Sequence, residues 1–212
     1  DNAMFLIALD YLLEMAPDSP QASRWKSLRE GIERNVRAHL WDVKRQKFIP
    51  HIYPEKSPIP EGFDELAIHY HGGTAIAIEA GLLSKDEIRT VNAQMLENVR
   101  LSGMPSIGLT LYPVYPDGFF HGGMSKAYLY QNGGDWTWFG GRMIQQLVVN
   151  GMVEEAYAEI HPMIERVIQN DGFYEWYGKG GVPSGSGNFK GSAGVLSKAI
   201  ELLRDWAEKN KS

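Results

Sequence analysis

The sequence predicts an all-α protein of the α/α-toroid class, present as part of a barrel of helical hairpins. Two observations predict this fold. Apolar helical segments alternate with amphipathic ones along the 212 residues, and long loops rich in glycine and aromatic residues separate the pairs. Inner-ring helices contact protein on both sides and are apolar all round, whereas outer helices keep one face in water. A linear solenoid of hairpins is the alternative, but its repeats keep more uniform lengths.

The first pair of helices occupies the N-terminal part of the chain. Residues 2–14 are apolar almost all round, which predicts a buried inner helix that ends before Pro17 and Pro20. Residues 21–40 place Trp25, Leu28 and similar side chains at helical spacing among charged residues, which predicts an amphipathic outer helix.

The remaining elements repeat this alternation. A short extended segment at 47–53 precedes an apolar helix at 65–80 and a charged helix at 84–101, where Ser84 and Glu87 have the spacing of a capping box. After a loop at 102–134, the second half of the chain predicts an apolar helix at 135–150, an amphipathic one at 153–169, a glycine-rich loop at 171–191 and a last helix at 192–209.

Composition bounds the class of protein. A chain of 212 residues is long enough for a single domain with a sizeable core, and we treat residues 1–212 as one domain. The net charge of -5 with interspersed signs argues against a nucleic-acid partner, and the apolar runs are shorter than a membrane span. The absence of cysteine excludes disulfides and thiolate metal sites. It fits a reducing compartment and weakly favours the cytoplasm.

One segment concentrates residues that can hold a ligand. Residues 128–142 read Tyr-Leu-Tyr-Gln-Asn-Gly-Gly-Asp-Trp-Thr-Trp-Phe-Gly-Gly-Arg. Aromatic rings stack on the apolar face of a sugar, while amides and carboxylates bind its hydroxyls in fixed directions. The alternative is that these aromatic residues simply pack at the start of a helix. The candidate residues are Tyr130, Gln131, Asn132, Asp135, Trp136, Trp138 and Arg142.

Four segments, in this order, resemble the C-terminal half of six-hairpin, (α/α)6-barrel glycosidases. They are Asp1-Asn-Ala-Met-Phe-Leu-Ile-Ala-Leu-Asp-Tyr11, Gly72-Gly-Thr-Ala-Ile-Ala-Ile78 with Gly81-Leu-Leu, Tyr130-Gln-Asn-Gly-Gly-Asp-Trp136, and Phe173-Tyr-Glu-Trp-Tyr177 followed by Gly191-Ser-Ala-Gly-Val195. The most similar groups are the neutral invertases, trehalases and glycogen-debranching glucosidases. The resemblance covers nearly the whole chain and is specific for the superfamily, not for one substrate.

The resemblance implies an inverting mechanism with two carboxyl groups. It implies that Asp1 is the general acid and Glu175 the general base, with Asp135 a rival for either role. Inverting hydrolysis places such carboxyl groups roughly 6.5–9.5 Å apart, which leaves room for the attacking water. An Asp before a helix is also an ordinary N-cap, so Asp1 has a structural alternative. Trp176 and Tyr177 follow Glu175 and join the candidate substrate-binding residues.

We therefore expect a glycoside hydrolase that acts on an α-glucoside or a similar small sugar or oligosaccharide. A sugar phosphorylase of the same fold and a non-catalytic helical module that binds carbohydrate or protein are the alternatives. No cofactor is expected, and no histidine and carboxylate spacing indicates a metal site. The resemblance also implies that the N-terminal half of the barrel lies outside this chain. We expect the chain to need that half, or to self-associate through exposed inner helices, and to have little activity alone.

Overall fold

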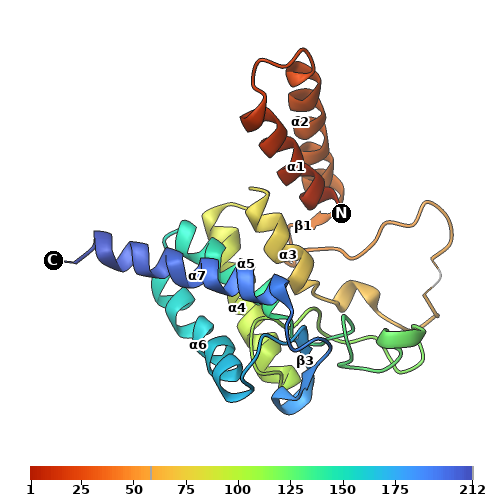
Figure 1. Ribbon diagram of the computed structural model, residues 1–212. Coiled ribbons are helices and arrows are strands. Elements are labelled where there is room, and N and C mark those ends of the chain that lie inside the picture. The colour runs from red at the N-terminus through yellow and green to blue at the C-terminus, as the bar shows by residue number, and fades with distance from the viewer. Residues whose placement is uncertain (58, 212) are drawn as a thin grey trace.

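A computed structural model describes residues 1–57 and 59–211 of the chain. Its seven described α-helices run in sequence with only short strands and 3-10 turns between them (Figure 1). The α-helices are α1 (Asn2–Met15), α2 (Ala22–His39), α3 (His71–Glu79), α4 (Lys85–Ser102), α5 (Thr137–Val149), α6 (Val153–Gln169) and α7 (Lys190–Lys209). The 3-10 turns are η1 (Glu65–Ala67), η2 (Gly122–Met124) and η3 (Lys179–Gly181).

The named strands among the described residues form two small antiparallel pairs. Strand β1 (Trp41–Asp42) pairs with β2 (Lys47–Phe48), and β3 (Trp176–Tyr177) pairs with β4 (Pro183–Ser184). The all-α class predicted from the alternation of helices is confirmed. The predicted extended segment at 47–53 is a strand only at its first two residues.

The core is built around α5, which lies between α3 and α7 and also contacts α6. Three residues of α5, Met143, Ile144 and Leu147, have no exposed surface. This is the environment expected of an inner helix, since neighbours cover it on several sides. The long loops all lead into the N-terminal ends of α3, α5 and α7, so they gather at one end of these helices.

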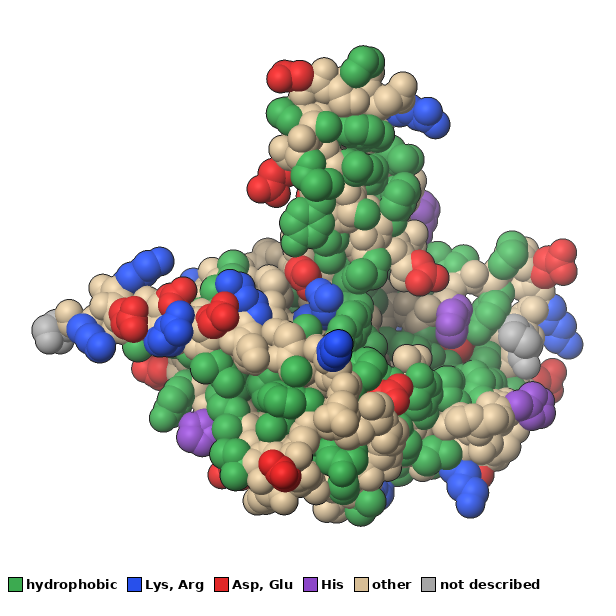
Figure 2. All heavy atoms as spheres, viewed as in Figure 1, with side chains coloured by type: hydrophobic (Ala, Val, Ile, Leu, Met, Phe, Trp, Pro, Cys, Tyr) green, Lys and Arg blue, Asp and Glu red, His purple; other side chains and the backbone are tan. Residues whose placement is uncertain are grey.

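Helix α1 departs from its prediction as a buried helix. Only Leu6 and Leu9 are buried, while Phe5, Tyr11 and Met15 are 47%, 57% and 73% exposed. The helix contacts α2 and α3, which cover one of its sides. The α1–α2 hairpin stands out from the rest of the molecule, and hydrophobic side chains cover much of its visible surface (Figure 2).

Helix α3 begins six residues later than the predicted start at residue 65. His69 exchanges two backbone hydrogen bonds with Tyr112, of 2.7 and 3.0 Å, and this bridge holds the residues before α3 in an extended conformation. The helical pattern of residues 65–70 is therefore overridden by the backbone pairing of His69 with Tyr112, a residue far along the chain.

The start of α4 is as predicted. The Ser84 hydroxyl accepts a hydrogen bond from the Glu87 backbone, and the Glu87 carboxylate accepts one from the Ser84 backbone at 2.8 Å. This reciprocal arrangement satisfies two N–H groups that the helix itself leaves unpaired. Across the described part of the chain, no helix combines the length and the apolar character that crossing a membrane requires.

Candidate functional site

The loops at the N-terminal ends of α5 and α7 are joined by a short backbone ladder. Trp136 donates to the Gly108 carbonyl at 2.8 Å, and Thr110 donates to the Gly134 carbonyl at 3.0 Å. On its other side, Asp135 exchanges two backbone hydrogen bonds with Tyr177, of 2.9 and 2.8 Å. The segment 130–136 is therefore fixed between two other loops.

Three predicted substrate-binding residues meet on this ladder. The Tyr130 ring lies edge-on to Trp136, with centroids 4.9 Å apart, and edge-on to Trp176 at 6.2 Å. The Trp136 indole N–H donates to the Tyr130 carbonyl at 3.2 Å. Trp136 and Trp176 are buried, and Tyr130 is partly exposed. The sequence motif therefore does form one aromatic cluster, of which Tyr130 is the most accessible member.

The paired glycines of this segment serve the backbone. Gly133 has φ of +88°, which favours glycine. A Cβ on Gly134 would overlap the Tyr130 carbonyl oxygen and would lie 3.1 Å from the Trp176 ring. Both glycines are explained by the turn and by close packing, with no ligand required.

Asp135 is completely buried. One carboxylate oxygen lies 2.8 Å from an Arg166 nitrogen, and Ser106 donates to the carboxylate at 2.7 Å. Arg166 also donates to Thr137 at 2.6 Å and lies over the Tyr177 ring, 4.0 Å from its centroid. Asp135 is thus the centre of a buried network that ties α6 to the start of α5.

Asn132 and Tyr177 are buried as well, each with no exposed surface. The Asn132 side chain accepts from the Tyr115 backbone at 2.9 Å and donates to the carbonyls of Tyr115 and Lys126 at 3.0 and 3.2 Å. These contacts brace the loop before and after η2. In the structure, both residues contact protein on all sides.

Glu175 is only partly buried and has a different environment. Its backbone N–H donates to the Ser186 carbonyl at 2.9 Å, and its side chain lies against Gly185, where a Cβ would approach Glu175 Oε2 to 2.5 Å. No ion pair of the described residues involves it. Glu175 is thus a carboxylate without a cationic partner within the described chain, next to Trp176 and against the β3–β4 turn.

Asp1 is exposed, and its side chain makes no cap hydrogen bond with α1. The neighbouring Asn2 lines a cavity of about 590 Å³ together with His51 and Tyr53. Figure 1 shows the N-terminus beside β1 and well apart from β3. In this structure, therefore, Asp1 does not join the aromatic cluster around Glu175.

Of the last three candidates, Arg142 and Trp138 lie between inner helices, and Gln131 lies in a loop. Arg142 lies over the Trp138 ring, 4.4 Å from its centroid, and pairs with Glu79 at the end of α3. Trp138 also packs beside Gly191 at the start of α7. Gln131 is exposed and lines a cavity at the start of α3.

That cavity contains residues that the sequence analysis did not single out. His51, Tyr70 and Tyr115 line it, and Glu65 is hydrogen-bonded to His51 and Tyr115. These residues lie far apart between positions 51 and 115 and share no motif, so only the fold brings them together.

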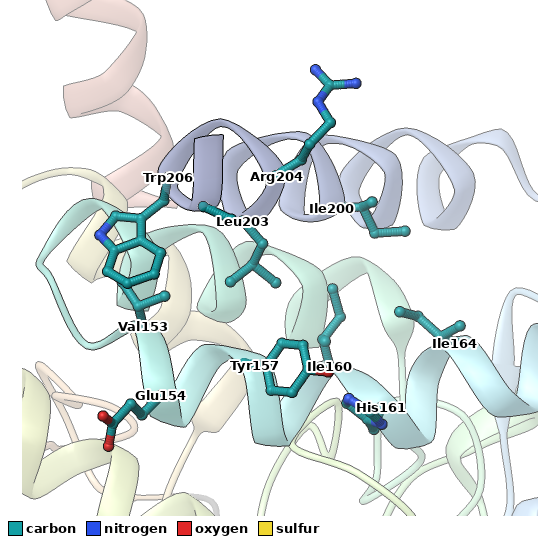
Figure 3. Close-up of a pocket in the computed structure, with 11 residues that line it drawn as sticks. Val153, Glu154, Tyr157, Ile160, His161, Ile164, Ile200, Leu203, Arg204 and Trp206 are labelled. Carbon is teal, nitrogen blue, oxygen red and sulfur yellow. The ribbon is translucent and has the colours of Figure 1, made fainter. Parts of the chain in front are cut away.

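A second cavity, of about 610 Å³, lies between α6 and α7 (Figure 3). Tyr157, Ile160 and Leu203 line it, and the Arg204 side chain points away from it. Its lining is mainly apolar, which does not suit a sugar. Within the described residues, no group of three or more histidine and carboxylate side chains is placed to hold a metal ion.

Comparison with solved structures decides the kind of fold. The chain is similar to a GH63 mannosylglycerate hydrolase from Thermus thermophilus, whose crystal structure is in complex with Tris and D-glycerate, with a TM-score of 0.62 and 18% sequence identity. The chain has a glycosidase-like helical fold. The match covers 96% of this chain and 44% of that chain, so this chain spans less than half the length of its structural neighbour. No family model and no curated protein sequence matches it.

Proposed function

We propose that this chain forms the base-bearing side of a glycoside hydrolase active site, with Glu175 as the general base. The observation that carries the proposal is the position of Glu175. Glu175 is partly exposed, its side chain lies against Gly185, and the next residue in the chain, Trp176, belongs to the aromatic cluster. Unlike the buried Asp135, Glu175 has no cation among the described residues to hold it.

The chemistry follows from these groups. An aromatic ring such as Tyr130 offers a surface for the apolar face of a sugar, while a carboxylate that is not held by a cation can take a proton from the attacking water. We propose an α-glucoside or a similar small sugar as the substrate and inversion at the anomeric carbon as the outcome. Asp1 remains our prediction for the general acid, and Asp135 is proposed to position the loop rather than to react.

A second candidate function is non-catalytic carbohydrate binding. The separation of the N-terminus from β3 in Figure 1 favours it, because hydrolysis needs a second carboxyl group near the first. Binding needs only the aromatic cluster. The two functions differ in whether a bound sugar is turned over.

The test compares Glu175→Gln with Asp171→Asn, which removes a charge from the same loop at an exposed position. In a protein that joins this chain to the predicted N-terminal half of the barrel, we expect hydrolysis of aryl α-glucosides to fall about 10²–10⁴-fold in Glu175→Gln, since Gln cannot accept the proton from water. Asp171→Asn should retain activity. Unchanged hydrolysis in Glu175→Gln would refute the assignment, and sugar binding without turnover in the longer, unmodified protein would favour the binding module. Cleavage that requires inorganic phosphate would indicate a phosphorylase.

Asp1 is tested by the leaving group. When a 2,4-dinitrophenyl glucoside is hydrolysed, the 2,4-dinitrophenolate leaves without being protonated. Its hydrolysis therefore does not need a general acid. If Asp1 is the acid, Asp1→Asn should lose activity on a methyl glucoside and keep it on the dinitrophenyl glucoside. Equal losses on both substrates would exclude this role.

A further inference from the structure

The cavity at the start of α3 has a volume of about 370 Å³, which is large enough for a single sugar ring. Its aromatic wall includes Phe120 and Phe139, and its polar wall includes His51 and Tyr70. Gly73 opens onto it, since a Cβ there would meet no atom within 4 Å. Gln131 belongs both to this cavity and to the segment that carries Tyr130 and Trp136.

A carboxylate behind the polar wall organises it. Glu65 Oε1 accepts hydrogen bonds from Tyr115 at 2.7 Å, His51 Nδ1 at 2.8 Å and Tyr53 at 3.0 Å. Burial alone would raise the pKa of Glu65, but the hydrogen bonds from Tyr115, His51 and Tyr53 outweigh it and lower the pKa. Glu65 is therefore ionised at neutral pH and acts only as an acceptor.

Because Glu65 can only accept, the direction of each hydrogen bond among His51, Tyr70 and Tyr115 is fixed. Because Glu65 only accepts, His51 Nδ1 carries a proton, and whenever the imidazole is neutral its Nε2 is left as an acceptor. Tyr115 donates its one O–H to Glu65. In its hydrogen bond with Tyr70, Tyr115 must therefore accept, and Tyr70 donates. Burial raises the pKa of Tyr70 to about 12, so this hydroxyl stays protonated. With the imidazole neutral, the hydrogen-bonding capacity that His51 Nε2 and Tyr70 Oη have left is that of acceptors.

We propose that this cavity is a carbohydrate subsite in which His51 Nε2 and Tyr70 Oη accept hydrogen bonds from the hydroxyl groups of one sugar ring. The ring hydroxyls supply the donors that His51 and Tyr70 accept from, and Phe120 and Phe139 offer apolar surface to the C–H groups of the ring. The proposal deepens the proposed function, on which it rests, by placing a second sugar-binding position next to the Glu175 site through Gln131.

The experiment measures the Kd of methyl α-D-glucopyranoside for the full chain by calorimetry or ligand-observed NMR. In Glu65→Ala, the acceptor that holds the proton on His51 Nδ1 is removed, so the neutral imidazole can carry its proton on Nε2 and lose the acceptor there. We expect binding to weaken about tenfold, the loss typical of one hydrogen bond. Glu61→Gln, which removes a charge at an exposed position of the same segment, should bind as the unmodified chain does.

Two more variants keep the test independent of folding. His51→Phe removes the acceptor while Glu65 retains its bonds from Tyr53 and Tyr115, and it should also weaken binding about tenfold. Gly73→Leu fills the cavity without touching the hydrogen-bonded wall and should abolish binding there. An unchanged Kd in folded His51→Phe and Gly73→Leu would overturn the proposal.

Its failure is distinguishable from failure of the proposed function. If Glu175→Gln abolishes turnover while the cavity variants bind normally, the hydrolase proposal stands and the subsite proposal falls. If the sugar binds with the expected dependence on His51 but Glu175→Gln leaves turnover unchanged, the subsite stands and the base assignment falls. Binding of Tris with dependence on Glu65, without binding of the glucoside, would assign the cavity to a cation and overturn the proposal.

Discussion

The two acidic residues near the aromatic cluster differ in burial and partners. Asp135 is fully buried between Arg166 and Ser106, whereas Glu175 is partly exposed and unpaired by any cation among the described residues. A carboxylate that is held by a buried cation is poorly placed to take a proton from water. This contrast is why we assign reactivity to Glu175 and a positioning role to Asp135.

The role of Asp135 is tested by the change in the free energy of unfolding when Asp135 is replaced. Asp135→Asn leaves Arg166 as a buried, uncompensated charge, so we expect the free energy of unfolding to fall by about 3–5 kcal/mol. Urea denaturation measures the change. Arg166→Met in the same background should restore part of the loss, because it removes the unpaired charge. If Asp135→Asn has normal stability, the network does not hold the loop.

Glu159 predicts a dependence of stability on pH. It is buried on α6, accepts one hydrogen bond from Asn92 at 2.7 Å, and its Oε2 has no partner among the described residues. Burial raises its pKa from 4.5 to about 7. The folded state therefore holds this proton more tightly than the unfolded state, and the stability it contributes is full below pH 4.5 and is lost as the pH rises through 7.

We expect Glu159→Gln to remove this loss. The amide oxygen keeps the bond from Asn92 but carries no charge at any pH. The variant should match the unmodified chain at about pH 4.5 and be more stable at about pH 8, by on the order of 3 kcal/mol. Melting temperatures at both values measure it. A constant difference between the two proteins across this pH range would contradict this explanation.

At the scale of elements, the chain order of helices is regular, but their environments are not. Helices α3, α5 and α7 receive the long loops at their N-terminal ends, and those loops carry most of the candidate residues. The ladder between segments 108–110, 134–136 and 176–177 holds two of the loops in place. The backbone segments of this ladder approach one another closely at glycines such as Gly108 and Gly134, which have no side chain.

Gly134→Ala is expected to disturb this ladder. Its Cβ would overlap the Tyr130 carbonyl oxygen, so the segment must shift, at a cost of about 1–3 kcal/mol. Thermal unfolding and the loss of tryptophan near-UV circular dichroism measure the change. Gly73→Ala is the control, because its Cβ meets nothing and alanine favours a helix by about 0.5–1 kcal/mol. A Gly134→Ala protein as stable as the control would show that the ladder tolerates the shift.

At the scale of the whole molecule, α1 presents an uncovered apolar stripe. Met4, Phe5, Tyr11, Leu12 and Met15 are each at least 36% exposed, and they recur at helical spacing. Contiguous apolar surface of this kind marks an interface. That the N-terminal half of a barrel covers it remains a prediction, which the 44% coverage of the structural neighbour motivates.

In a purified sample the available partner is a second copy of the chain, so we expect self-association through α1. Sedimentation velocity should show a sedimentation coefficient that increases with concentration. Replacing Phe5 and Leu12 with Gln should shift the equilibrium toward monomer, because it breaks the stripe. Ile168→Gln, on α6 with 73% exposure, should have no effect. A clean monomer at all concentrations would contradict this prediction.

The sequence by itself determined the helices and most of their order. Apolar and amphipathic periodicity predicted the all-α class, and the capping box at Ser84 and Glu87 formed as predicted, because both depend on residues close together in the chain. Tyr130 and Trp136 also lie together, because they share one short segment.

Only the tertiary structure decided which polar residues are accessible. Asn132, Asp135 and Glu175 look alike as ligand-site candidates, but the first two are sealed by contacts with residues far along the chain, Tyr115 and Arg166. The same kind of long-range contact assembles the wall of His51, Glu65, Tyr70 and Tyr115, which no local pattern predicts. Burial and hydrogen-bond direction are properties of the packed chain, because each depends on groups that the sequence separates and the fold brings together.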